Sequence, residues 1–167
     1  MVERSRCSNC GYFHVGPAPE ICPVCGAPRS SFLTYDGPGD LTGTKTLENL
    51  KAAFAGESQA NRRYTLYKRI AELQGADEAV AAFQRALTEE TAHALGHLAY
   101  FGGFGDTRAN LETAIGGEGY ECTTMYPEFA RVAEEEGLTD IARYFTMVGA
   151  YEKEHHDQFK KALEGLG

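Results

Sequence analysis

Apolar side chains recur with a period near 3.6 residues along most of the chain after residue 45. This spacing predicts four helices, which cover about 46–74, 77–101, 108–136 and 139–163. Thr46 is a plausible N-cap of the first helix, and Gly75 and Gly137 are plausible stops. The connections between the segments are short, which favours antiparallel neighbours. The fold class is therefore mainly α, with a four-helix bundle as its main part.

Each of the four apolar stripes contains a glutamate near its middle. These are Glu57, Glu90, Glu118 and Glu152, in helix order. A buried carboxylate without a partner is costly, so four of them in one bundle core need a common explanation.

Two of these glutamates begin a Glu-x-x-His motif, Glu90 to His93 and Glu152 to His155. A spacing of three residues puts both side chains on one helix face, one turn apart. One Glu from each of two helices, with Glu-x-x-His from each of the other two, is the ligand set of ferritin-like di-iron proteins. Carboxylates neutralise and bridge the two ions, and imidazoles complete their ligand sets.

Glu121 follows Glu118 by three residues and adds a carboxylate that a plain di-iron site does not require. We expect Glu121 and His93 to alternate on one iron as its oxidation state changes. Pro127 and three nearby glycines are poor helix formers, and we expect a kink or bulge there that re-aims Glu118 and Glu121.

The first 40 residues have a different character, with five of the six prolines, four of the five cysteines and no periodic stripe. Two Cys-x-x-Cys-Gly motifs supply the thiols of Cys7, Cys10, Cys22 and Cys25. Four thiolates bind zinc or a single iron tetrahedrally. Taken alone, the motif fits a zinc ribbon at least as well as an iron site, but beside a di-iron bundle iron is favoured because it changes oxidation state. We expect a metal-stapled domain over 1–36, a linker over 37–45 and a bundle over 46–167.

Composition narrows the function classes. The net charge of −8 disfavours nucleic-acid binding, and no apolar run reaches the length of a membrane span. The chain begins without an apolar leader, and its five cysteines fit metal or redox chemistry better than a disulfide framework. We therefore expect a cytoplasmic protein.

Together these features resemble the rubrerythrins, which join a rubredoxin-like centre to a ferritin-like di-iron bundle. The matching stretches are Cys7 to Phe32, Ala55 to Ala60, Glu118 to Glu121 and Met125 to Ala130. The cysteine motifs precede the bundle, as in the reverse rubrerythrins. Two departures are Cys122, where relatives often have Trp, and the short connection between the second and third helices.

The resemblance assigns Glu57, Glu90 and either Glu121 or His93 to one iron. It assigns Glu118, Glu152 and His155 to the other, with Glu90 and Glu152 bridging. Tyr64 and Tyr126 match tyrosines of the family's peroxide pocket. Cys122 is expected to be a small buried side chain.

The resemblance also implies a peroxidase that reduces hydrogen peroxide to water. Its electrons would come from NAD(P)H through a partner reductase or rubredoxin, because no dinucleotide-binding fingerprint occurs in this chain. A head-to-tail homodimer is expected, with the Fe(Cys)4 relay facing the partner's di-iron site. The alternatives are a ferritin-like iron oxidase or storage protein and a zinc-ribbon interaction module.

Overall fold

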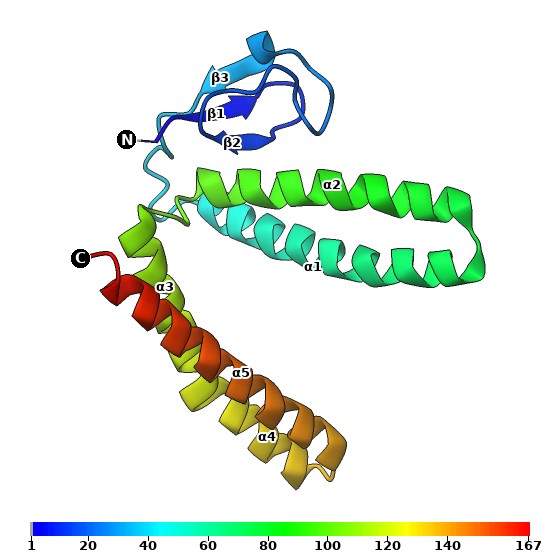
Figure 1. Ribbon diagram of the computed structural model, residues 1–167, viewed down its shortest axis with the longest axis vertical. Coiled ribbons are helices and arrows are strands. Elements are labelled where there is room, and N and C mark those ends of the chain that lie inside the picture. Colours follow the sequence, from blue (N-terminus) through cyan, green and yellow to red (C-terminus); the bar gives the residue numbers. More distant parts are fainter. Residues whose placement is uncertain (1) are drawn as a thin grey trace. The chain divides into compact units, whose positions relative to one another are not determined.

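The computed structural model describes residues 2–167 and has a small N-terminal sheet followed by helices (Figure 1). The strands β1 (Arg4–Cys7), β2 (Phe13–Val15) and β3 (Phe32–Thr34) form an antiparallel sheet in the order β2-β1-β3. A 3₁₀ turn, η1 (Arg29–Ser31), precedes β3. Within 2–167, the largest of the fully buried side chains are those of Cys7 and Cys22. A domain this small has little apolar core, so the cysteines occupy the place where a metal staple is needed.

The helices are α1 (Lys45–Gln74), α2 (Asp77–Tyr100), α3 (Thr107–Tyr120), α4 (Tyr126–Glu135) and α5 (Thr139–Glu164). The prediction that the chain is mainly helical is confirmed, and the helix ends are correct to within one residue except within 108–136. The predicted N-cap Thr46 is wrong, because the Thr44 hydroxyl accepts a hydrogen bond from the Leu47 amide, 3.2 Å away. At the other end of α1, Gly75 takes a left-handed conformation that favours glycine.

The helix predicted over 108–136 is interrupted by a π-helical turn, η2 (Glu121–Met125), between α3 and α4. The expected bulge is thus confirmed, and it begins at Glu121. Pro127 lies in the first turn of α4, directly after the π turn. A π turn adds a residue to the helical repeat and changes the direction of the side chains that follow.

The chain divides into two compact units, residues 1–103 and 104–167. In the first, α1 and α2 lie side by side as a hairpin and the small sheet contacts α2 (Figure 1). In the second, α3 and α4 pack along α5. Gly149 of α5 faces Tyr126 so closely that an added Cβ would lie 3.0 Å from the tyrosine Cβ. A glycine is needed there for the two helices to approach.

The buried Asn61 side chain links α1 to α2 by hydrogen bonds. The Asn61 side chain donates hydrogen bonds to the Leu87 carbonyl oxygen at 3.0 Å and to the Thr91 hydroxyl at 2.9 Å. Asn61→Ala should lower the free energy of unfolding by about 1–3 kcal/mol, since two buried hydrogen bonds are lost. Urea denaturation checks this. Gln59→Ala, on the exposed side of the same helix, should change the value by less than about 0.5 kcal/mol, and an equal effect of both variants would contradict the role of Asn61.

Candidate metal centres

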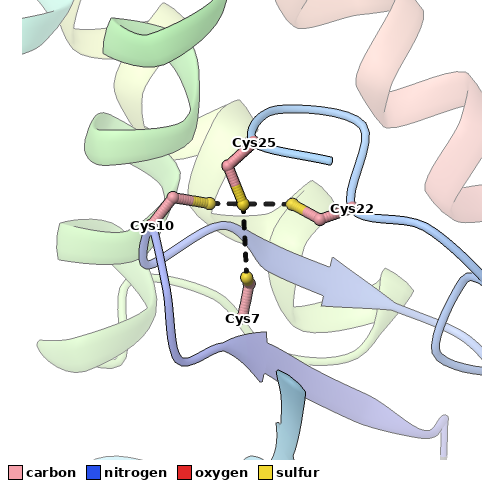
Figure 2. A group of neighbouring side chains, drawn as sticks. All are labelled: Cys7, Cys10, Cys22 and Cys25. Carbon is pink, nitrogen blue, oxygen red and sulfur yellow. Dashed lines mark hydrogen bonds between the residues drawn. The ribbon is translucent and has the colours of Figure 1, made fainter. Parts of the chain in front are cut away.

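The first centre is the group of four thiols in the N-terminal domain. Cys7 ends β1, Cys10 follows in the next turn, and Cys22 and Cys25 lie in the loop between β2 and η1. Figure 2 shows all four sulfur atoms directed toward one point. The Sγ atoms of Cys7 and Cys25 are 3.8 Å apart, and those of Cys10 and Cys22 are 3.6 Å apart.

These separations fit one tetrahedral metal ion. A metal–sulfur distance of ~2.3 Å places tetrahedral sulfur atoms ~3.8 Å from one another. Burial raises the pKa of the Cys10 thiol to about 12, with the neighbouring thiols adding to the effect. Hydrogen bonds from the Asn9 side chain and the Ala27 amide lower the pKa of Cys25 to about 6. A metal ion binds thiolates, so its binding to this cluster releases the protons of the thiols.

Two further groups each contain two glutamates and a histidine, and each lies within one unit. In the first unit, Glu57 of α1 meets Glu90 and His93 of α2, with ligand atoms within 4.8 Å of one another. The Nδ1 atom of His93 is 3.1 Å from a carboxylate oxygen of Glu90. The proximity of Glu90 raises the pKa of Glu57, and burial adds to this.

In the second unit, Glu118 of α3 meets Glu152 and His155 of α5 within the same limit. The Nδ1 atom of His155 is 2.7 Å from Glu152 and 3.6 Å from Glu118. The pKa of Glu118 is raised by burial and by Glu152, and the pKa of His155 is raised by Glu152. Within 2–167, the buried Oε2 atom of Glu118 has no hydrogen-bond donor. The carboxyl groups of Glu118 and Glu152 repel each other when both are ionised. A bound cation would neutralise both carboxylates and would give the Glu118 Oε2 atom a partner.

The remaining predicted site residues lie near these groups but outside them. Glu121, at the start of the π turn, belongs to neither of the two Glu-Glu-His groups. Its negative charge nevertheless contributes to the raised pKa values of Glu118 and Tyr126. Tyr126 packs against Phe129 and Phe145, and burial followed by the charge of Glu152 raises its pKa.

Tyr64 lies with Tyr67 and Phe83 between α1 and α2. Cys122 is half-buried and lines a cavity of about 570 Å³ with Tyr126.

A contact that the sequence did not predict joins the thiol cluster to α2. Cys10 and Cys25 line a cavity of about 500 Å³ together with His93, Arg85 and Glu89 of α2. Tyr35 of the small domain donates a hydrogen bond to the Ala99 carbonyl oxygen. The only sequence signal for this is Gly96, where a Cβ would lie 3.3 Å from the Gly11 carbonyl oxygen.

The carboxylate groups predict an unusual pH dependence for the metal-free protein. Because the folded-state pKa values of Glu57, Glu118 and His155 are raised, the folded state binds more protons than the unfolded state. Its free energy of unfolding should therefore fall as the pH rises from about 5 to 7.5, above the ordinary glutamate pKa of about 4.3.

Urea denaturation of chelator-treated protein across this range measures the slope. Glu57→Gln should flatten it, because a neutral amide replaces a carboxyl that must ionise beside Glu90. A free energy of unfolding that rises with pH over this range would contradict the account.

None of the helices within 2–167 is both long and apolar enough to cross a membrane.

Comparison with known proteins identifies the family to which both parts of the chain are similar. The Rubrerythrin family profile matches residues 48–163, and the profile of the rubrerythrin rubredoxin-like domain matches residues 6–33. Rubrerythrin-1 of Clostridium acetobutylicum is 37% identical over 143 residues, which cover 75% of this chain and 73% of that protein. A rubrerythrin of Porphyromonas gingivalis is 35% identical over 136 residues, with 74% of this chain and 68% of that protein covered.

One further relative is named a reverse rubrerythrin. Reverse rubrerythrin-1 of C. acetobutylicum is 30% identical over 136 residues, which cover 72% of this chain and 75% of that protein. The thiol cluster is thus the rubredoxin-like site, and the two Glu-Glu-His groups are the di-iron ligand groups of a ferritin-like domain. With both profiles matched and both kinds of iron site present, the chain belongs to the rubrerythrin family of di-iron oxidoreductases.

Proposed function

We propose that this protein is a peroxidase that reduces hydrogen peroxide to water with electrons relayed through the thiol-bound iron. The observation that carries the proposal is the cavity shared by Cys10, Cys25 and His93. It puts a one-electron site beside a ligand of the carboxylate site. The bound irons would supply the two electrons of the reaction H₂O₂ + 2 H⁺ + 2 e⁻ → 2 H₂O.

The chain's own residues would hold and neutralise the metal pair. Glu57, Glu90 and His93 would bind one ion, and Glu118, Glu152 and His155 the other, with Glu90 and Glu152 bridging. Four carboxylates balance the charge of two divalent ions. The Nδ1 atoms of both histidines already face the carboxylates, so metal binding would exchange a proton for an ion with little movement.

Proton supply would come from groups beside the carboxylates. The Tyr126 hydroxyl has a raised pKa, so it stays protonated at neutral pH and can donate a hydrogen bond to a bound peroxide oxygen. The Tyr64 hydroxyl would donate a second hydrogen bond to peroxide from the α1–α2 hairpin. The electron donor would be a rubredoxin or a reductase that oxidises NAD(P)H, docking near the exposed Cys25.

A single-turnover experiment tests the proposal. Protein reduced chemically without oxygen and then freed of reductant should consume about one peroxide per chain, with oxidation of the paired irons. Peroxide consumption no faster than that of the same amount of free ferrous ion would contradict it. Uptake and retention of many irons per chain would instead indicate the iron-storage alternative.

Glu121 would act as an exchangeable ligand, replacing His93 when the irons are oxidised. Its absence from the group of three in this structure fits the His93-bound arrangement. Glu121→Ala should therefore lower peroxidase activity more than it lowers iron content. Steady-state assays and metal analysis of the same samples give the comparison, with Glu112→Ala as an exposed control on α3. Structures of both oxidation states with the same ligand in each would contradict the exchange.

A further inference from the structure

Helix α2 contains a glycine one turn after His93. Gly96 is buried, although glycine is the poorest helix former apart from proline. A Cβ at this position would lie 3.3 Å from the Gly11 carbonyl oxygen, which is closer than ordinary van der Waals contact. The backbone that directly follows Cys10 therefore lies against α2 at the turn that begins with His93.

The loop that carries Cys10 has little freedom to move away from a larger side chain at position 96. The Gly11 amide donates a hydrogen bond to the Cys7 carbonyl oxygen at 2.9 Å, and the Cys7 amide donates one to the Tyr12 carbonyl oxygen, also at 2.9 Å. Gly11 has a φ of +78°, a left-handed conformation that favours glycine. A side chain on α2 at this point would therefore displace the whole loop, and Cys10 with it.

Tyr35 provides a second point of attachment, one turn further along α2. Its hydroxyl donates a hydrogen bond to the Ala99 carbonyl oxygen, which lies in the last turn of the helix, where carbonyl groups lack helical donors. The Tyr35 amide donates a hydrogen bond to the Arg4 carbonyl oxygen at 3.0 Å, which ties this residue to β1. Burial raises the pKa of Tyr35, so the hydroxyl keeps its proton at neutral pH.

Aromatic side chains pack around this second point. The Tyr35 ring meets Phe13 edge-on with centroids 5.1 Å apart, and it meets Tyr100 with centroids 6.1 Å apart. The Arg6 guanidinium lies 5.8 Å from the centroid of the Tyr100 ring, a distance that permits a cation–π interaction. Strands β1 and β2 are thus both joined to the end of α2, which fixes the orientation of the small domain on the helix.

We propose that Gly96 and Tyr35 are positioning residues for electron transfer, which together hold the thiol cluster beside His93. Neither residue is a member of the three metal-ligand groups. Gly96 would set the distance by letting the Cys10 loop approach α2, and Tyr35 would set the orientation. The inference rests on the proposed relay function, and it adds that the rate of the relay depends on how the small domain packs on α2.

Substitutions of Gly96 in the iron-loaded protein test the distance. After rapid reduction of the thiol-bound iron, the return of its ferric absorption gives the rate of electron transfer to the oxidised pair. In Gly96→Leu this rate should fall on the order of 100-fold, a loss that a misplacement of about 1 Å can cause. Gly96→Ala should lie between this variant and the wild type, because one methyl group requires only a small shift. Ala82→Leu enlarges an exposed side chain of the same helix and should keep the wild-type rate.

Tyr35→Phe tests the second point, because it removes the hydroxyl and keeps the ring. The same rate should fall by about 2–12-fold, the change in an equilibrium constant that the loss of one net hydrogen bond brings. Tyr120→Phe is the matched control, since Tyr120 is exposed. Tyr35→Phe and Gly96→Ala also keep the proposal testable if Gly96→Leu does not retain the thiol-bound iron.

The reduction potential of the thiol-bound iron separates positioning from a change in the iron site itself. It should equal the wild-type value in every variant, because no ligand is altered. Wild-type rates in Gly96→Leu and Tyr35→Phe, or slower rates that a shifted potential accounts for, would overturn the proposal. Wild-type protein in which the thiol-bound iron never reduces the pair would instead contradict the relay function.

Discussion

Cys10→Ser is expected to abolish peroxide reduction driven by an electron-donor protein while leaving the helices and the di-iron groups intact. The Cys10 thiol is one corner of the tetrahedral cluster, and its Sγ lies 3.6 Å from that of Cys22. Loss of a direct ligand should cost more than the 10–100-fold that removal of an outer partner of a metal ligand costs. We therefore expect donor-driven turnover to fall at least ~100-fold.

Chemically reduced Cys10→Ser protein should still consume about one equivalent of peroxide per chain in a single turnover. The di-iron ligands lie on α1, α2, α3 and α5, outside the domain that contains Cys10. Cys122→Ser makes the same chemical change outside the cluster and should retain donor-driven turnover. Full donor-driven turnover in Cys10→Ser would remove the relay from the mechanism.

Glu90→Ala should remove the coupled iron pair and leave the thiol-bound iron in place. Glu90 lies between Glu57 and His93 and is the ligand that both of its neighbours contact. Single-turnover peroxide consumption should fall at least ~100-fold, again beyond the cost of losing an outer partner of a ligand. Mössbauer spectroscopy distinguishes the two kinds of iron in one sample.

Although Glu90→Ala should abolish iron-pair binding, it should stabilise the metal-free protein against unfolding. Removing Glu90 relieves the repulsion that raises the pKa of Glu57, so the free energy of unfolding at pH 7 should rise. Glu89→Ala is the matched control, because Glu89 is the adjacent residue and pairs with Arg85 at 2.8 Å. A coupled pair that survives in Glu90→Ala would show that the centre is built differently.

Much of this arrangement could be predicted from the sequence because its signals are local. Cysteine spacing fixes the thiol cluster, and helical period puts Glu90 beside His93 and Glu152 beside His155. The error at the first N-cap has the same local origin, since Thr44 and Thr46 are both good caps and only the backbone geometry decides between them.

Features that depend on packing between elements were harder to predict. A bulge is indicated by the poor helix formers Gly116, Gly117, Gly119 and Pro127. No local rule, however, predicts that a π turn begins at Glu121 or that Glu121 lies outside the ligand groups. The cavity that joins Cys10 and Cys25 to His93 depends on how the small domain packs on α2. Gly96 hints at that contact without identifying its partner.

Metal analysis of protein purified without oxygen tests the central claim most directly. The account predicts about three iron ions per chain, one for the thiol cluster and two for the Glu-Glu-His groups. Mössbauer spectra of the same sample should show one iron with four sulfur ligands and a coupled pair with oxygen and nitrogen ligands. One zinc per chain without iron would contradict the account and favour a zinc-ribbon interaction module.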